Sequence, residues 1–189
     1  MERYLCLLKF YSKMFTSGYM SDVELLKTYR LFLRDYMKLL RENPSYEIDR
    51  NSTLYRDGNC YSYALRLPTP RIFSDNYKAK TGYDFSHDIG FLSDREYSND
   101  ICTCYDNLRC DLDFLGIHYY ESDIDKSNNH GGYKILFLKS YDDFHFLREN
   151  SDGTWSHKRG YDSFIERTSY DSELFDDFKR VKTLEIVMK

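Results

Sequence analysis

The amino-acid sequence predicts an α+β fold within a single domain. Patterns typical of helices come first along the chain, and patterns typical of strands gather after Gly131-Gly132. Helices followed by strands are characteristic of α+β domains, and a length of 189 residues suits one domain. We therefore expect N-terminal helices packed on an antiparallel β-sheet, with residues 1–50 as a helical extension and residues 51–189 as the core.

The clearest helix signal covers residues 21–43. Ser21 and Glu24 form the Ser-x-x-Glu pattern of a capping box, and apolar side chains follow at helical spacing. Pro44 ends the segment, because proline disfavours helical geometry in the residue before it. The sequence therefore predicts one long amphipathic helix near the N-terminus.

Other segments before the strands carry weaker signals. Residues 1–15 are apolar and aromatic and fit a short helix or a strand, whereas residues 44–58 have the composition of a polar loop. A short helix is expected over residues 60–67, ended by the prolines that follow. Residues 71–130 show weak periodicity, which favours short helices and loops with a strand near residues 117–120.

The strand signals form an antiparallel meander. Lys134 to Lys139 is a mostly apolar run, Phe144 to Glu149 alternates, and Thr154 to Lys158 follows a turn. A closing strand is expected over Thr183 to Met188. These strands supply the sheet on which the helices are expected to pack.

Composition excludes several classes of function. The net charge of −4 and the pI of about 5.7 come with no basic face, which argues against nucleic acid as a partner. No signal peptide or run of membrane-spanning length is visible. Five cysteines at irregular spacing do not form a disulfide framework. We expect a protein of the reducing cytoplasm, without membrane partners.

Cys60 is the first candidate for chemistry. It follows Asp57-Gly58-Asn59, a loop that leads directly into the expected helix. Unpaired N–H groups at a helix N-terminus lower the pKa of a thiol and can hold an oxyanion. The alternative is a buried structural cysteine. The position favours Cys60 as a nucleophile, with Asp57 or Asn59 capping its helix.

His145 is the second candidate. Strand alternation places it on the face opposite Phe144 and Phe146, where a rigidly held imidazole suits a general base. The alternative is a half-buried histidine bonded to a neighbour. The strand therefore offers His145 as the base for Cys60.

His157 is expected beside His145. Gly153 suits the left-handed position of a three-residue hairpin loop, and the resulting register pairs Leu147 with His157. His157 then lies one diagonal step from His145, roughly 7 Å away at Cβ. We expect His157 to orient His145. Three other polar residues of this hairpin compete for that role: Glu149, Asn150 and Asp152.

The motifs NCYSYAL, from Asn59, and DFHFLRENSDGTWSHKRG, from Asp143, resemble those of the papain-like cysteine peptidase superfamily, closest to its NlpC-type branch. They are also similar to motifs in poorly characterised proteins of bacteria and large DNA viruses. The resemblance implies a papain-like, NlpC-like catalytic core over residues 51–189. By resemblance Cys60 is the nucleophile, His145 the base and His157 the orienting residue. Tyr61 stands where many of these enzymes have Trp, and Asn51 or Asn59 would supply the oxyanion donor.

These roles predict a hydrolase that cleaves a peptide, isopeptide or glutamine side-chain amide through a covalent acyl-enzyme, without a cofactor. A protein or peptide is then the substrate. The alternative is a catalytically inactive scaffold that binds proteins, which a tyrosine-rich surface favours. A weaker alternative is a zinc site whose four ligands would be Cys102, Cys104, Cys110 and His118. Free cysteines in an irregular region are the preferred interpretation.

Overall fold

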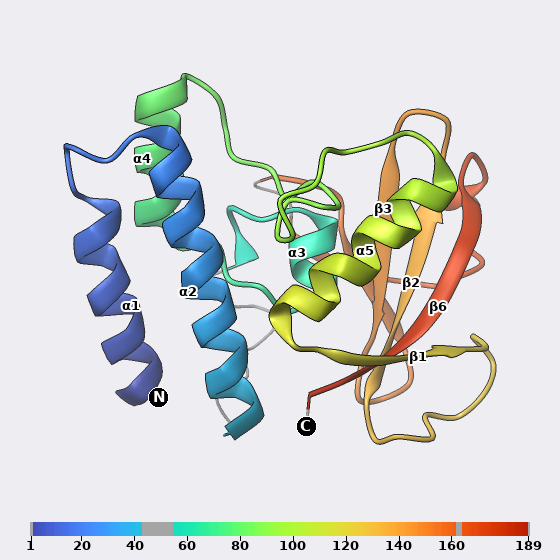
Figure 1. Cartoon of the computed structure of the whole chain (residues 1–189). Coiled ribbons are helices and arrows are strands. Elements are labelled where there is room, and N and C mark those ends of the chain that lie inside the picture. Colours follow the sequence, from blue (N-terminus) through green and yellow to red (C-terminus); the bar gives the residue numbers. More distant parts are fainter. Residues whose placement is uncertain (1, 43–54, 162–163, 189) are drawn as a thin grey trace.

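The computed structural model describes residues 2–42, 55–161 and 164–188. The helices are α1 (Glu2–Phe15), α2 (Asp22–Glu42), α3 (Cys60–Ala64), α4 (Arg71–Thr81), α5 (Ile101–Leu115) and the 3₁₀ turn η3 (Glu173–Phe175). The strands are β1 (His118–Ser122), β2 (Tyr133–Lys139), β3 (Phe144–Glu149), β4 (Trp155–Lys158), β5 (Ile165–Thr168) and β6 (Lys179–Val187). The chain therefore has the predicted α+β architecture (Figure 1).

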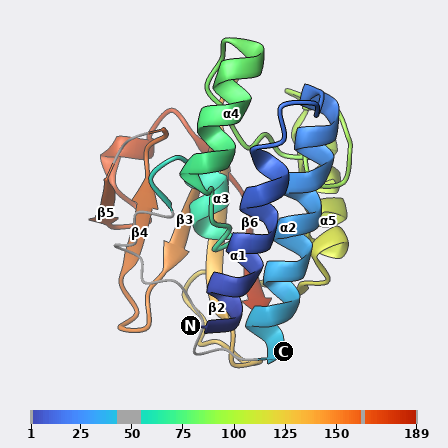
Figure 2. The ribbon, with the colours of Figure 1, turned by 90° about the vertical axis from the view of Figure 1, so that its left-hand side faces the viewer.

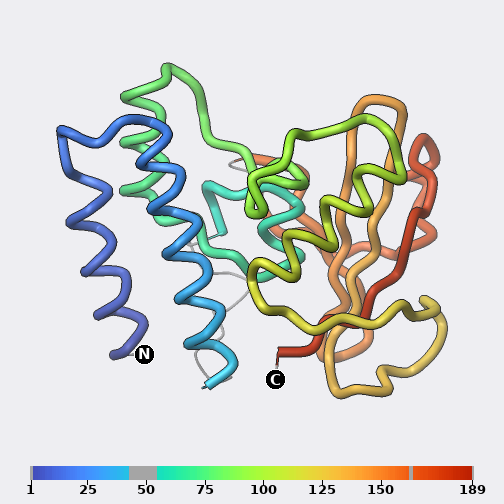
Figure 3. Tube along the Cα trace, in the orientation of Figure 1, coloured from blue at the N-terminus to red at the C-terminus, as the bar shows by residue number. Residues whose placement is uncertain are grey.

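The six strands form one sheet in the order β1-β6-β2-β3-β4-β5. Every neighbouring pair is antiparallel. The strands β2 to β5 follow one another as a meander, but β6, the last along the chain, lies between β1 and β2. In the trace of Figure 3 this last strand runs beside β2, and the two ends of the chain lie at the same end of the molecule.

The α-helices cover one face of the sheet in two layers. The helices α1, α2 and α4 pack against one another, as the turned view of Figure 2 shows. Between them and the sheet lie α3, which contacts β3 and β4, and α5, which contacts β1 (Figure 1). The short helix that begins at Cys60 therefore lies in the middle of the molecule.

Strand alternation divides the apolar side chains between the two faces of the sheet. On β3, Phe144 and Phe146 join the large core that contains the helices, and Leu147 joins a smaller cluster on the other face. That smaller cluster also holds Trp155 and Phe175. Because β2 to β4 are covered on both faces, polar groups on them are buried as well.

Local sequence signals explain the ends of α2. The backbone N–H of Glu24 donates to Ser21 Oγ at 3.2 Å, and the N–H of Ser21 donates to a Glu24 carboxylate oxygen at 2.8 Å. These reciprocal bonds are the predicted capping box. The described part of the helix ends at Glu42, and the predicted stop at Pro44 lies outside the described residues.

Several expectations need correction. The helix at Cys60 ends at Ala64 rather than at residue 67, whereas residues 2–15 form a helix, one of the two structures expected there. The segment 71–130 holds two regular helices, of 11 and 15 residues, instead of short helices. The predicted loop 44–58 falls largely outside the described residues. The described part of the chain contains no helix that is long and apolar enough to cross a membrane.

Candidate functional site

Asn59 fixes the start of α3. Its Oδ1 accepts hydrogen bonds from the N–H groups of Tyr61 and Ser62, both at 3.1 Å, so it is the predicted N-cap. Its Nδ2 donates to the His87 carbonyl at 2.8 Å and to Ser86 Oγ at 3.2 Å. The side chain is fully engaged in holding the helix.

This engagement changes the expected oxyanion site. Because the Asn59 Nδ2 group donates to Ser86 and to the His87 carbonyl, it is not free to donate to an oxyanion. The other expected donor, Asn51, lies outside the described residues. A role for Asn59 as oxyanion donor is therefore corrected to that of a helix cap.

Cys60 lies at the first position of α3 with only 5 % of its surface exposed. Its Sγ donates to the carbonyl of Phe144 on β3 at 3.9 Å. Burial raises the pKa of the Cys60 thiol to about 12, and hydrogen bonds from the backbone of Phe146, Tyr61 and Cys60 offset this only in part. The expected lowering of the Cys60 pKa is therefore wrong: desolvation outweighs the helix N-terminus.

His145 and His157 lie side by side on β3 and β4. The register pairs Leu147 with His157, as predicted, and the N–H of Asn150 donates to the carbonyl of Thr154 at 2.7 Å across the hairpin turn. As a result, Nε2 of His145 lies 2.9 Å from Nδ1 of His157. The structure thus brings together two of the three predicted site residues in a direct hydrogen bond.

Phe175 covers this histidine pair. Its ring centroid is 5.3 Å from the ring of His145 and 5.3 Å from that of His157, and the two histidines are 8 % and 1 % exposed. Burial, helped by His157 and Arg159, lowers the pKa of His145 to about 3. Burial also lowers the pKa of His157, although Glu166 opposes it. Both rings are therefore neutral at neutral pH.

Glu166 decides which ring nitrogens carry protons. A carboxylate oxygen of Glu166 lies 3.9 Å from Nε2 of His157, and its negative charge favours the tautomer with the proton on that nitrogen. Nδ1 of His157 then accepts, and Nε2 of His145 donates. This arrangement leaves the lone pair of His145 on Nδ1, where it can take a proton from another group.

Cys60 and His145 meet the same short piece of β3 from different sides. The Sγ of Cys60 reaches the carbonyl of Phe144, the residue just before His145, from the helical side, whereas the ring of His145 packs on Phe175 at the other face. Within the described residues no hydrogen bond joins Cys60 to His145. Cys60 and His145 therefore both lie against the start of β3, but they are not in direct contact.

The competing hairpin residues are engaged elsewhere. Oδ1 of Asn150 accepts from Ser156 at 2.9 Å, and the Asp152 carboxylate caps the turn and binds Arg167. The Glu149 carboxylate accepts from the backbone N–H of Lys134 and from Asn128. Among the residues weighed for orienting His145, His157 is the one that bonds to it.

Two buried polar groups beside the site, Asp111 and His87, are not among the predicted site residues. Asp111 of α5 is fully buried and accepts from Tyr61 Oη at 2.8 Å. It falls on the apolar stripe of α5 with Leu108 and Leu112, and a carboxylate in such a stripe was the available signal. His87 is fully buried, and its Nε2 lies 2.8 Å from Tyr29 Oη.

The four residues weighed as zinc ligands do not converge. Cys102 is exposed, and Cys104 is buried with its Sγ 2.6 Å from the carbonyl of Ser98. In residues 2–42, 55–161 and 164–188 no group of three or more His, Cys, Asp or Glu side chains is arranged to hold a metal ion. All five cysteines of the chain are free thiols.

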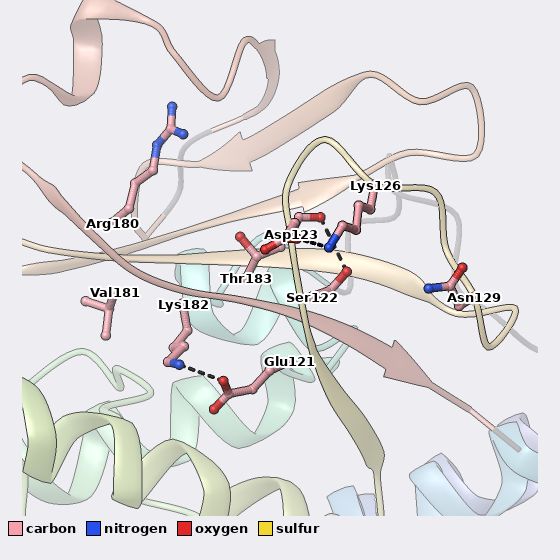
Figure 4. A pocket seen from close by; sticks show the side chains of 9 residues that line it. All are labelled: Glu121, Ser122, Asp123, Lys126, Asn129, Arg180, Val181, Lys182 and Thr183. Carbon is pink, nitrogen blue, oxygen red and sulfur yellow. Dashed lines mark hydrogen bonds and ion pairs between the residues drawn. The ribbon is translucent and has the colours of Figure 1, made fainter.

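A hollow of about 550 Å³ lies over β1, β6 and the loop after β1, away from the histidine pair on β3 and β4 (Figure 4). Four of its charged side chains form two pairs: Nζ of Lys182 is 2.6 Å from a Glu121 carboxylate oxygen, and Lys126 pairs with Asp123. The hollow holds none of the predicted site residues.

Comparison of the chain with protein family models, curated proteins and solved structures finds no match.

Proposed function

We propose that this chain is a cysteine hydrolase that cleaves a peptide, isopeptide or glutamine side-chain amide through a covalent acyl-enzyme. Cys60 is the nucleophile, His145 the base and His157 the residue that orients the base. The observation that carries the proposal is the 2.9 Å bond between His145 Nε2 and His157 Nδ1. This bond leaves His145 Nδ1 as a base on the strand that Cys60 contacts.

The proposed reaction moves one proton at each stage. Nδ1 of His145 takes the Cys60 proton while Sγ bonds to the amide carbonyl carbon. The protonated imidazole then gives that proton to the leaving nitrogen as the carbon–nitrogen bond breaks. Water, activated by His145, attacks the thioester and restores the thiol. His157 holds the ring throughout, and Phe175 shields the histidine pair from water.

Burial shapes this chemistry. With the pKa of Cys60 raised to about 12 and that of His145 lowered to about 3, the resting pair is a neutral thiol and a neutral imidazole rather than an ion pair. Sγ lies 3.9 Å from the Phe144 carbonyl on the helical side of β3, whereas the His145 ring packs on Phe175 at the other face. The proposal therefore requires a rearrangement around β3 on substrate binding that brings Sγ within reach of His145 Nδ1.

The proposed setting follows from the same features. A protein or peptide is the substrate class, no cofactor takes part, and neither nucleic acid nor a membrane is a partner. A reducing compartment such as the cytoplasm fits five free thiols. A papain-like, NlpC-like core is the proposed relation of the site to known enzymes, and it rests on the two motifs around Cys60 and His145.

A second candidate function is a catalytically inactive scaffold that binds proteins. Two observations favour it: Cys60 is 5 % exposed with a raised pKa, and its hydrogen bond goes to a carbonyl rather than to His145. In that case the histidine pair is a structural feature of the hairpin. The two candidates differ in whether Cys60 accepts an acyl group.

The test is acylation by p-nitrophenyl acetate. The wild-type protein is expected to release a burst of p-nitrophenolate and to carry an acetyl group on Cys60, read by peptide mass spectrometry. Cys60→Ala removes the burst, and His145→Ala slows it about a hundredfold at pH 7.5. Cys104→Ala, which alters another buried cysteine, leaves the burst unchanged.

An acetyl group spread over lysines and exposed cysteines, with no preference for Cys60, would reject the hydrolase in favour of the binding scaffold. A Cys60-dependent burst that survives His145→Ala unchanged would reject the assigned base. Circular dichroism of each variant separates loss of chemistry from loss of fold.

A further inference from the structure

Asp111 gathers four hydrogen bonds at one buried carboxylate. Besides Tyr61 Oη at 2.8 Å, it accepts from the backbone N–H of Gly90 at 2.7 Å. It also accepts from the N–H and the hydroxyl of Ser93 at 2.7 and 2.6 Å. A buried carboxylate is stable only while such donors stay in place. The link therefore joins α5, the loop at residues 90–93 and the first turn of α3.

Tyr61 is a rigid connection between this carboxylate and the site. Its hydroxyl is held by Asp111, and its ring packs on Phe144 and Phe146 of β3, with centroids 6.4 and 5.2 Å away. Those two residues flank His145, and Tyr61 follows Cys60 directly. A change in the position of Tyr61 must therefore change how Cys60 meets the strand that carries His145.

We propose that Asp111 is a positioning residue that acts through Tyr61 to hold Cys60 against β3 in register with His145. The catalytic meaning of this link rests on the proposed hydrolase function, but the placement of Cys60 can be measured without activity. The link spans α5, α3 and β3, so it sets the position of a five-residue helix that has one side-chain cap of its own.

The geometry explains why a carboxylate is needed here. A helix of five residues is too short to be stable alone, and Asn59 fixes only its N-terminus. A buried acceptor with several donors resists rearrangement, because any displaced donor or oxygen loses its partner in a low-dielectric interior. Asp111 thereby supplies a second fixed point on the other side of Cys60.

The test uses Tyr61→Phe, which removes the hydroxyl and keeps the ring on β3. Asp111 retains the donors of Gly90 and Ser93, so the variant is expected to fold. Tyr63→Phe is the control, since it deletes another buried hydroxyl of α3, bonded to Ser156 at 2.7 Å.

Two rates are measured at pH 8.5 for each protein: alkylation of Cys60 by iodoacetamide and acylation by p-nitrophenyl acetate. In Tyr61→Phe, the rate of Cys60 alkylation rises about tenfold, because a looser first turn of α3 admits water and lowers the pKa of the Cys60 thiol by about one unit. Acylation falls about tenfold, because the register with His145 is lost. Tyr63→Phe keeps both wild-type rates. If Tyr61→Phe raises both the alkylation and the acylation rate, or if Tyr63→Phe changes both rates to the same extent, the effect is a general loss of stability and the positioning role is rejected.

The outcomes separate the two proposals. If the wild-type protein shows no Cys60 acylation, the hydrolase fails, and the alkylation rates alone decide the positioning role. Equal alkylation of Cys60 in wild type and Tyr61→Phe overturns the inference.

Hydrogen exchange of the wild-type protein gives a second measurement. The backbone amide of Tyr63 in α3, bonded to the Asn59 carbonyl, should exchange as slowly as the amide of Gly90. If the Tyr63 amide exchanged much faster than the Gly90 amide, α3 and the loop at residues 90–93 would not form one rigid unit, whatever the variants do.

Discussion

At the scale of residues, the side-chain choice at position 157 determines which nitrogen of His145 is available. His157 presents Nδ1 to His145 because Glu166 attracts the proton of His157 onto Nε2. The bond is buried under Phe175, so it is not weakened by competition with water. The orientation of His145 therefore depends on a neighbour that does not itself touch the thiol.

Replacing His157 tests this dependence. His157→Phe is expected to slow Cys60 acylation by about tenfold to a hundredfold, because His145 loses its acceptor and its fixed tautomer. His157→Gln, which retains an acceptor oxygen, is expected to recover part of the rate. The measurement is the pH 7.5 burst rate of both variants, with folding checked by circular dichroism. A His157→Phe rate equal to wild type would remove His157 from the site.

Much of the residue-scale site follows from the sequence, and part does not. The pairing of Leu147 with His157 is a local consequence of a hairpin loop, so the contact of His145 with His157 could be predicted. The burial of Cys60 could not, because it depends on β3 and β4, which pack on α3 from a distant part of the chain. The sign of its pKa shift depends on that burial.

At the scale of elements, the turn between β3 and β4 sets the register on which the histidine pair depends. Gly153 adopts a positive φ of 76°, and the Asn150 N–H bonds to the Thr154 carbonyl beside it. A one-residue slip would move every side chain of β4 to the opposite face. The turn therefore contributes to the site without contacting it.

Gly153→Ala isolates this contribution. A Cβ at this position meets nothing within 4 Å, so the cost is the left-handed backbone alone. We expect the free energy of unfolding to fall by about 1 kcal/mol, and by less for Gly153→Asn, since Asn tolerates this conformation. Urea unfolding measures both variants. Gly18→Ala, also in open space but without a positive φ, should stay within error of wild type; an equal loss there would contradict the backbone explanation.

The elements that the sequence predicts well are those with local signals. The capping box fixed the start of α2, and alternation fixed β3. In contrast, α5 keeps polar residues such as Asn107 and Asp111 on its buried side, which hides its periodicity. The edge strand β5 has a mostly exposed pattern that carries little apolar signal. These elements are specified by tertiary contacts rather than by their own composition.

At the scale of the whole molecule, three buried histidines, His87, His145 and His157, couple the fold to pH. Burial lowers the pKa of His87 to about 3, as it does for His145. His87 sits among aromatic rings, including those of Phe85 and Tyr29. An unfolded chain, whose histidines titrate near 6.5, binds more protons than the folded one between pH 6.5 and 3. The contribution of these histidines to the free energy of unfolding is therefore fully present above pH 6.5 and is lost as the pH falls through this window.

His87→Phe is expected to reduce that loss. Between pH 7 and pH 4.5 the variant should lose about 2 kcal/mol less unfolding free energy than the wild type, because one buried neutral histidine no longer has to be protonated. Urea titrations at the two pH values provide the comparison. His118→Asn, at an exposed histidine, is the matched control. Parallel acid dependence in wild type and His87→Phe would show that His87 is accessible to protons in the folded state.

The place of β6 has a consequence for how the chain is made. This strand comes last of the six in sequence, yet it is inserted between β1 and β2. While the polypeptide emerges from a ribosome, β2 has one bare edge and β1 has no pairing strand until residues 179–187 have left the tunnel. The nascent sheet is then open to mispairing with other chains. A messenger truncated before Lys179 would yield a product that shows this edge permanently, a ready target for chaperones and proteases.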